Sequence, residues 1–275
     1  MRTYLKDCRW GRFLLLRGDM ISEHVNLLGE WCEAEVELFR SLLCETSDVI
    51  EVGANIGMHA VPLAKFACKG RLHCYEPQRV ISQILCANLA LNGLGNAHVF
   101  QKAVGAQAAC VEIAACDYDR PWNYGAFSVG EGFDAEAKFP GAVTREIVET
   151  TTIDIELERR PLARLDLIKI DAEGAEGAAI RGAEGAIARH RPYIFAEVGG
   201  GASFEEVFAG LKARGYACHW LLAKRARPGN FNGAVWSVEG ADANMLAVPE
   251  GRPLTHALAP VSGFADLVEG RVVAI

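Results

Sequence analysis

The residues with the clearest chemical signature are two glycines and an acid near residue 50. The apolar run Val49–Val52 leads directly into Gly53-x-x-x-Gly57, and a second strand ends at Glu76. A glycine turn at a helix start lets a ligand approach the backbone, where a side chain would fill the space. An acid at this offset, about twenty residues on, is placed to bind both ribose hydroxyls of an adenosine ligand. The pattern therefore predicts a site for an adenosine cofactor.

The spacing of the glycines indicates which adenosine cofactor fits. Dinucleotide-binding folds use Gly-x-Gly-x-x-Gly and phosphate-binding loops use Gly-x-x-x-x-Gly-Lys-Ser/Thr, and neither pattern occurs here. Glu51, which precedes the loop, suits a ligand with a cationic amino-acid tail, as in S-adenosylmethionine. The alternative is structural: Gly53 and Gly57 only make a tight turn, and Glu76 only ends a strand.

Three further acids are expected at the same edge of the sheet. Asp171 and Glu173 follow the apolar strand expected at 165–170, and Glu197 ends the next strand. Because the carboxyl ends of central strands face the ligand crevice, these side chains should converge there. Their carboxylates could accept a proton, hold a substrate hydroxyl or bind a divalent metal. We assign all three to catalysis, with Asp171 as the base or hydroxyl orienter, and we predict a site without metal.

These assignments have structural alternatives. Asp171 could be a helix N-cap, and Glu173 an acid of the first turn that matches the helix dipole. His59, near the glycine loop, could be a general base, but a partly buried histidine with a hydrogen-bond partner is the commoner case. Lys169 stands in an otherwise apolar strand and needs a carboxylate partner if it is buried. Asp171 or Glu197 could provide that partner.

Strand-like and helix-like segments alternate from residue 48 onward, which is typical of an α/β fold with a mostly parallel sheet. The expected strands are 49–52, 71–75, 97–104, 165–170 and 193–198, with a closing hairpin of 216–222 and 244–248. The expected helices are 58–67, 78–91, 175–189 and 204–214. We therefore predict a doubly wound, Rossmann-like sheet of seven strands.

The chain is expected to divide into three parts. Residues 1–47 form an N-terminal segment with an amphipathic helix that should cap the site. Residues 48–250 form the cofactor-binding domain, with a β-rich insertion at about 108–151 that carries the aromatic loop 122–127. The aromatic residues of this loop either contact substrate or only pin the insertion to the core. Residues 251–275 form a tail with an apolar end, which packs on this chain or on a partner. A homodimer is therefore one of the alternatives.

Composition limits the partners and the compartment. The 275 residues are 51% hydrophobic, enough for one large core, and their formal net charge is −7. This acidic balance disfavours nucleic acid, because such binding requires Lys and Arg to neutralise phosphates. Nine dispersed cysteines without a Cys-x-x-Cys pattern are typical of reduced thiols. Apolar runs are too short for a membrane span or a signal peptide. We therefore predict a cytoplasmic protein that binds neither membrane nor nucleic acid.

Three motifs together resemble the FkbM-type family of S-adenosylmethionine-dependent methyltransferases. They are the glycine loop 49–57, Tyr75-Glu76-Pro77, and the run Leu-Ile-Lys-Ile-Asp-Ala-Glu-Gly-Ala-Glu at 167–176, in the family's order. The segments at 29–31, 182–183, 191–192 and 244–249 also look like family positions. The resemblance covers roughly residues 25–250, and Lys-Ile-Asp-x-Glu-Gly-x-Glu is its most specific element.

The resemblance implies a class I methyltransferase fold and methyl transfer to a hydroxyl oxygen, often on a sugar, polyketide or other natural product. The family usually has Asp where this chain has Glu51, and the longer acid should still reach the cofactor's amino group or a water beside it. The residues that would line the methionine part of the cofactor are Glu51, Gly53, Ala54, Asn55 and Gly57, and Glu76 would bind the ribose. Beside them we place three further cofactor-binding residues, Pro77, Ala103 and Asp171.

The predicted function is S-adenosylmethionine-dependent methylation of a hydroxyl on a small molecule. An NAD-dependent oxidoreductase would use the same kind of sheet, but the third glycine of its fingerprint is missing. A non-catalytic regulatory protein that binds S-adenosylmethionine is the second alternative, because the sequence does not define the acceptor site.

Overall fold

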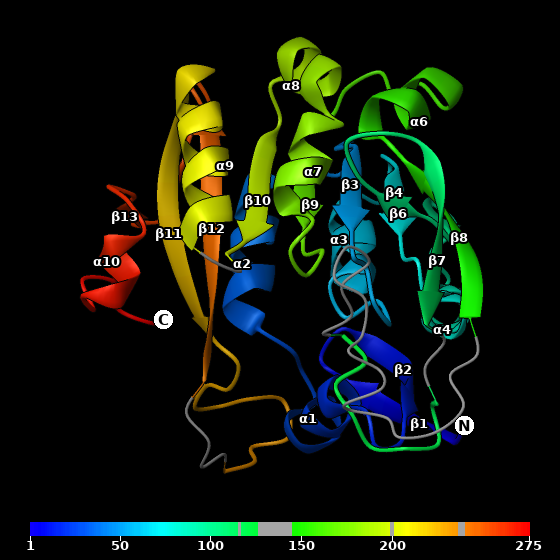
Figure 1. The fold of residues 1–275 in the computed structure, drawn as a ribbon. Coiled ribbons are helices and arrows are strands. Elements are labelled where there is room, and N and C mark those ends of the chain that lie inside the picture. Colours follow the sequence, from blue (N-terminus) through cyan, green and yellow to red (C-terminus); the bar gives the residue numbers. More distant parts are fainter. Residues whose placement is uncertain (115–116, 126–144, 199–200, 236–239) are drawn as a thin grey trace.

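The chain is built around an eight-stranded mixed sheet with the order β13-β11-β12-β10-β9-β3-β4-β5 (Figure 1). The computed structural model describes residues 1–114, 117–125, 145–198, 201–235 and 240–275. Strands β3, β4, β5, β9 and β10 run parallel, and β12, β11 and β13 pair antiparallel. The bounds are β3 Val49–Val52, β4 Leu72–Tyr75, β5 Ala97–Phe100, β9 Leu167–Ile170, β10 Tyr193–Glu197, β11 Tyr216–Lys224, β12 Ala241–Pro249 and β13 Ala259–Pro260.

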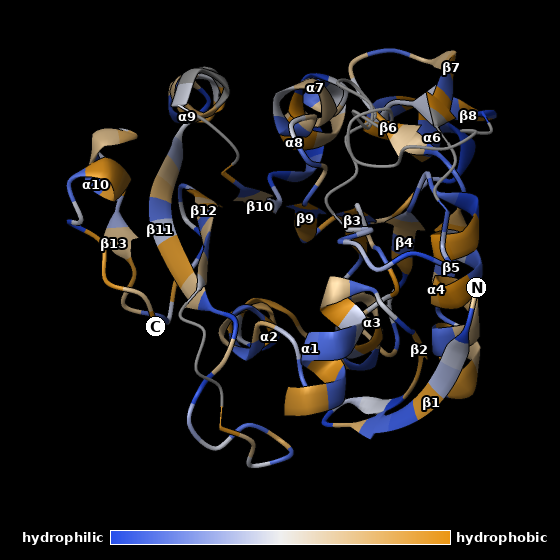
Figure 2. Cartoon of the chain, turned by 60° about the horizontal axis from the view of Figure 1, so that its bottom comes forward, coloured by the Kyte–Doolittle hydropathy of each residue, from blue (hydrophilic) through white to orange (hydrophobic). Residues whose placement is uncertain are grey.

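The central strands are buried along their whole length because helices cover both faces of the sheet (Figure 2). Successive side chains of a strand point to opposite faces, so Val49 and Ile50 of β3 pack into different cores. One face carries α2 Glu33–Leu42, α3 Ala60–Phe66 and α4 Arg79–Leu91. The other carries α6 Ile153–Arg159, α7 Glu176–Arg181, α8 Glu184–His190 and α9 Gly201–Ala213.

The doubly wound sheet is confirmed, but it has one strand more than the seven predicted, and two elements were wrong. The predicted strand 97–104 is split, since β6 Ala103–Val104 leaves the main sheet and pairs with β8 Arg145–Thr151. The predicted helix 175–189 is also split. A Cβ at Gly182 would lie 2.1 Å from the Gly105 carbonyl oxygen, and Asp154 accepts the Gly185 N–H at 2.8 Å to begin α8.

The insertion forms a second sheet beside the first. Strand β7 Ala109–Ala114 pairs antiparallel with β8, and β6 pairs with the other edge of β8. Of the aromatic loop, residues 122–125 are described, and 126–127 lie outside the described part. Tyr124 is fully buried, and the Trp122 N–H donates to the Gly18 carbonyl at 2.8 Å. These residues fix the loop to the N-terminal segment.

The N-terminal segment contains more structure than the single helix predicted. A hairpin of β1 Thr3–Cys8 and β2 Gly11–Leu16 is followed by α1 Met20–Leu28 and α2. The hairpin is attached to α4, because the Asn88 amide oxygen accepts the Leu14 N–H at 2.6 Å. Glu30, which follows α1, is buried and accepts from Arg9 Nε at 2.7 Å and Arg227 Nε at 3.1 Å. The segment is therefore held to both ends of the sheet.

The tail packs on this chain, along the edge of β11. Asp266, on the short helix α10 Ala265–Val268, accepts the Trp220 indole N–H at 3.0 Å. The backbone of Ile275 accepts from Lys224 at 2.8 Å and donates to Leu222 at 2.9 Å. Among the helices described, none has the length and apolar character needed to cross a membrane.

Candidate active site

A pocket of about 270 Å³ lies at the carboxyl ends of β3, β4, β9 and β10. Its volume is near the lower end of the roughly 300–1,000 Å³ that is typical of small-molecule sites. Every residue assigned to the site from sequence lines this cavity except Gly57, which lies behind it. The assigned residues in the lining are Glu51, Gly53, Ala54, Asn55, Glu76, Pro77, Ala103, Asp171, Glu173 and Glu197.

The glycine loop owes its composition to packing within the protein. Gly53 and Gly57 have φ values of +75° and +91°, which side chains rarely adopt. A Cβ at Gly53 would lie 1.7 Å from the Asp171 carbonyl oxygen, and one at Gly57 would lie 2.7 Å from Leu85 Cδ1. The sequence reasoning put a ligand in these spaces, and this was wrong, since protein atoms occupy them. The glycines seat the loop against β9 and α4, and the loop then lines the pocket.

Replacing Gly53 by Ala should therefore destabilise the fold itself. The positive φ costs about 1–2 kcal/mol, and the clash with the Asp171 carbonyl adds about 1–3 kcal/mol. Gly93→Ala is the matched control, because φ there is +69° and nothing lies within 4 Å of the added Cβ. Urea unfolding of both variants measures the difference. Equal losses would mean that the contact with Asp171 is easily relieved.

Glu76 is positioned by the loop it faces. Its Oε2 accepts the Asn55 N–H at 3.0 Å and its Oε1 accepts the Gln78 N–H at 2.9 Å. The side chain is buried in the pocket wall, and burial raises its pKa to about 7 against these two hydrogen bonds. A ligand that brings hydroxyl donors would stabilise the ionised carboxylate here.

Lys169 lines the pocket and has a carboxylate on either side. Its Nζ is 3.3 Å from Asp171 Oδ2 and 3.4 Å from Glu51 Oε1, and the lysine is 1% exposed. Burial alone would lower the pKa of the amine, but Asp171, Glu51 and Glu35 more than offset it, so the pKa is raised. The prediction of an Asp171 partner is confirmed. The second partner is Glu51 on the neighbouring strand, which the sequence analysis did not suggest.

The three predicted catalytic acids come together at one wall of the pocket. Asp171, Glu173 and Glu197 each offer a carboxylate oxygen within 4.8 Å of the others. The helix-cap alternative is wrong for Asp171 and Glu173, because α7 begins only at Glu176. Glu176 itself accepts the N–H groups of Ala172 and Gly174, both at 3.1 Å. Asp171 and Glu173 are thus left to face the cavity.

Crowding of these acids favours protonation of two of them. Burial and the charge of Asp171 raise the pKa of Glu173 to about 7. Burial, Asp171 and Glu173 raise the pKa of Glu197, which also shares a hydrogen bond with Asp171. Burial and crowding therefore favour the protonated form of Glu197, which lies beside Asp171 and its ion pair with Lys169.

A further part of the pocket wall was missed by sequence reasoning. Residues of the N-terminal segment, Arg225 directly after β11, and residues of β12 complete the cavity, and they are distant in sequence from the motifs. The Asn244 side chain donates to Glu35 Oε1 at 3.0 Å, and β12 places Asn244 opposite Glu197. The only signal was the family-like appearance of 29–31 and 244–249. The additional lining residues include Trp31, Cys32, Glu35, Arg225, Asp242 and Asn244.

His59 also lines the pocket, at the start of α3. Its ring is buried, and burial together with Lys169 lowers its pKa well below the usual value. Nε2 lies 3.5 Å from Glu35 Oε2 but makes no hydrogen bond with any residue of the described chain. The expected hydrogen-bond partner is therefore missing from these residues, and the imidazole is neutral.

The pocket residues fit S-adenosylmethionine. The buried Oε1 of Glu51 is paired with Lys169 Nζ at 3.4 Å, which is long for a hydrogen bond, and it accepts no hydrogen bond from the described residues. Burial, opposed by Lys169, raises the Glu51 pKa to about 7. A cationic amino group near Glu51 and ribose hydroxyls near Glu76 would satisfy both carboxylates.

Comparison with known proteins identifies the family. A model of the FkbM methyltransferase domain matches residues 51–218, more than half of the chain. The structure of methyltransferase FkbM from Methylobacillus flagellatus KT is 16% identical with a TM-score of 0.48, covering 78% of this chain and 50% of that one. This chain thus spans about half the length of that protein.

A second structure bears on the fold. Precorrin-6y C5,15-methyltransferase from Geobacter metallireducens GS-15 is 10% identical with a TM-score of 0.51, and the match covers 86% of this chain and 94% of that one. Curated protein sequences give no match. The domain match and the sheet agree, and the chain belongs to the FkbM family of S-adenosylmethionine-dependent methyltransferases.

Proposed function

We propose that the chain transfers the methyl group of S-adenosylmethionine to a hydroxyl oxygen of a small molecule. The supporting observation is the convergence of Asp171, Glu173 and Glu197 within 4.8 Å, beside the glycine loop. A hydroxyl must lose a proton as its oxygen is methylated, so a positioned carboxylate is the group that such an acceptor requires. Carboxylates also orient hydroxyls through charge-assisted hydrogen bonds.

The roles of the residues follow from their charge states. The bound cofactor supplies an activated methyl carbon for in-line displacement. Asp171 orients the acceptor hydroxyl and takes its proton, because this half-exposed carboxylate faces the cavity while Lys169 Nζ holds its Oδ2 at 3.3 Å. The protonated Glu197 holds Asp171 through their shared hydrogen bond. The walls must keep the acceptor oxygen about 3–3.5 Å from the methyl carbon and exclude water.

The charge of the pocket supports a small acceptor over nucleic acid. Its lining contains the acids Glu35, Glu51, Glu76, Asp171, Glu173, Glu197 and Asp242. The basic residues of the lining, Lys102, Lys169 and Arg225, all pair with carboxylates. A phosphate backbone would be repelled from such a site.

Methyl transfer to fractionated small-molecule extracts, with methyl-labelled S-adenosylmethionine, tests the proposal. Label in a base-stable ether is expected, because methyl esters hydrolyse in base. Calorimetry with S-adenosylhomocysteine and NAD should detect only the former. Binding of NAD would favour the oxidoreductase, and cofactor binding without transfer to any fraction would favour a regulatory protein. Label on nitrogen or carbon would overturn the O-methyl assignment.

Glu76→Gln should lower the affinity for S-adenosylhomocysteine by at least about tenfold. Hydrogen bonds to a charged group are worth roughly 1.5–3 kcal/mol against about 1 for neutral ones, and 1.4 kcal/mol is tenfold in affinity. Calorimetry measures the affinity. Urea unfolding without ligand is the control, since Glu76 also holds Asn55 and Gln78. Lower stability with unchanged affinity would make Glu76 a loop anchor only.

A further inference from the structure

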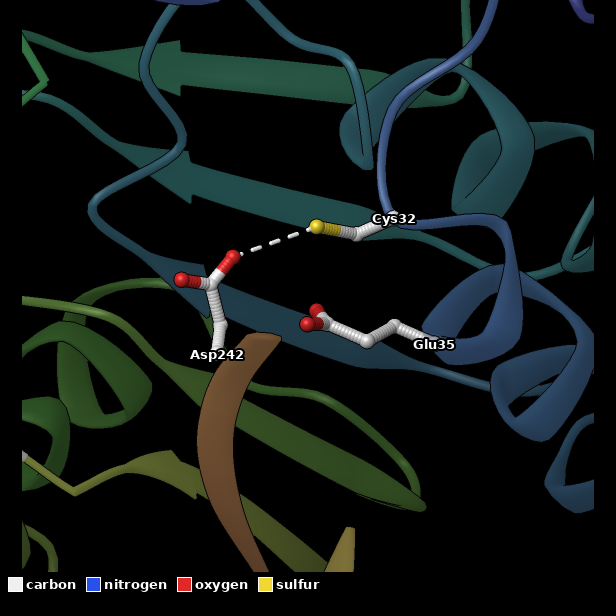
Figure 3. Close-up of side chains that lie close together, drawn as sticks. All are labelled: Cys32, Glu35 and Asp242. Carbon is white, nitrogen blue, oxygen red and sulfur yellow. Dashed lines mark hydrogen bonds between the residues drawn. The ribbon is translucent and has the colours of Figure 1, made fainter. Parts of the chain in front are cut away.

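A second group of potential ligands lies in the same pocket, next to the catalytic acids. Cys32 precedes α2, Glu35 is in its first turn, and Asp242 is at the start of β12. In Figure 3 the three side chains point toward one another, Cys32 and Glu35 from the start of α2 and Asp242 from β12. One donor atom from each lies within 4.8 Å of the others, and all three residues line the pocket. They fall outside the matched family domain, residues 51–218.

A buried histidine points to a cation at this place. His59 Nε2 lies 3.5 Å from Glu35 Oε2 and makes no hydrogen bond among the described residues. His59 and Glu35 are 6% and 4% exposed. An imidazole nitrogen and a carboxylate oxygen at this distance repel each other unless a proton or a metal ion lies between them, and 3.5 Å is long for a hydrogen bond. Two ligands about 2.1 Å from one tetrahedral ion would be about 3.4 Å apart.

The separation of the other donors matches metal coordination as well. Cys32 Sγ is 3.4 Å from Asp242 Oδ2, to which the thiol donates. With bonds of about 2.3 Å to sulfur and about 2.1 Å to oxygen, a tetrahedral zinc site would hold these atoms about 3.6 Å apart. Each of these two pairs therefore needs to move by only a few tenths of an ångström, and Glu35 lies within 4.8 Å of Cys32 and Asp242.

We propose that Cys32, Glu35 and Asp242 bind one divalent transition-metal ion of the zinc class, with His59 beside Glu35 as the adjacent nitrogen donor. On binding, the sulfur–hydrogen bond breaks, the proton leaves to solvent and a sulfur–metal bond forms, without any change in oxidation state. Arg225 Nε contacts both oxygens of Asp242, at 2.9 and 3.0 Å. Each carboxylate oxygen retains a second lone pair for the metal.

Sulfur distinguishes this site from the neighbouring acids. Asp171, Glu173 and Glu197 offer only oxygen, which suits magnesium, calcium or manganese. A thiolate with carboxylates and imidazole selects zinc, cobalt or iron instead. The thiol is therefore the spectroscopic label for the proposed site.

Cobalt titration of the chelator-treated full chain, under anaerobic conditions, tests the proposal. The wild type should bind one cobalt ion and develop a near-ultraviolet thiolate-to-cobalt charge-transfer band, which one equivalent of zinc abolishes. Cys32→Ser should lose this band. Both Cys32→Ser and Asp242→Asn should lower the affinity for cobalt by at least about tenfold. Cys8→Ser is the matched control, because Cys8 is also buried but lies on β1 away from the pocket, and it should behave as the wild type.

Other results would overturn the proposal. These are no charge-transfer band in the wild type, a band that survives in Cys32→Ser, or cobalt bound with oxygen ligands only. Circular dichroism of both site variants shows whether they fold, and Asp242→Asn tests the site while keeping the thiol. Binding of S-adenosylhomocysteine to metal-free protein is measured in parallel, so failure of the metal site and failure of the proposed function are separate results.

Discussion

Asp171→Asn is expected to lower methyl-transfer turnover by about 10²- to 10⁴-fold, the usual contribution of a positioned general base. The amide keeps the shape of the side chain but cannot take a proton. Affinity for S-adenosylhomocysteine should change little. Initial rates on the labelled acceptor measure the loss, and calorimetry measures the affinity.

Asp154→Asn is the control for this experiment. Asp154, on α6, accepts backbone N–H groups from Gly185 and Ala186 at 2.8 and 2.7 Å, and it does not line the pocket. The turnover of the Asp154→Asn variant should stay near that of the wild type. Should Asp171→Asn also retain near-normal turnover, the role of Asp171 would be reduced to pairing with Lys169.

Lys169→Met should cost about 3–5 kcal/mol of unfolding free energy, as expected when one partner of a buried ion pair is removed. The remaining Glu51 is 1% exposed and would have to be ionised without its cation or take up a proton. Urea unfolding measures the loss. The double variant Lys169→Met with Glu51→Gln is the control and should recover most of it. A single-variant loss below about 1 kcal/mol would show that water or relaxation replaces the lysine.

The unfolding free energy lost in Lys169→Met should also depend on pH, and the direction of this dependence follows from the pKa of Glu51. Its folded pKa is already raised, from 4.5 to about 7, and removing Lys169 raises it further. The folded variant then binds a proton that the unfolded chain releases above pH 4.5. Stability therefore falls as pH rises through this window. The difference from the wild type should be smaller at pH 5 than at pH 8.

Much of the sheet could be predicted because its central strands are short, mostly apolar runs bounded by turns. Val49–Val52 and Leu167–Ile170 are buried on both faces, so their sequences leave little ambiguity. The break at Gly182 depends on a carbonyl from residue 105, and β13 is only Ala259–Pro260. Neither a remote contact nor a two-residue pairing leaves a periodic signal.

The site residues likewise divide into those that could be predicted from the sequence and those that could not. Asp171 and Glu197 could be predicted because strands in register bring their carboxyl ends to one edge. Glu35 and Asp242 could not, because they meet only after the N-terminal segment has folded back on β12. The role of Gly53 was misjudged for a similar reason, since the atom that excludes a side chain there belongs to another strand.

The outer edge of β11 has a consequence for self-association. An unpaired strand edge offers a row of backbone donors and acceptors on which another chain can add a strand and begin to aggregate. Here β13 pairs with His219 and Trp220, and the Ile275 backbone bonds to Leu222 and Lys224. The tail thus covers the outer edge of β11. Peptides or second copies that need this edge for β-addition would first have to displace it.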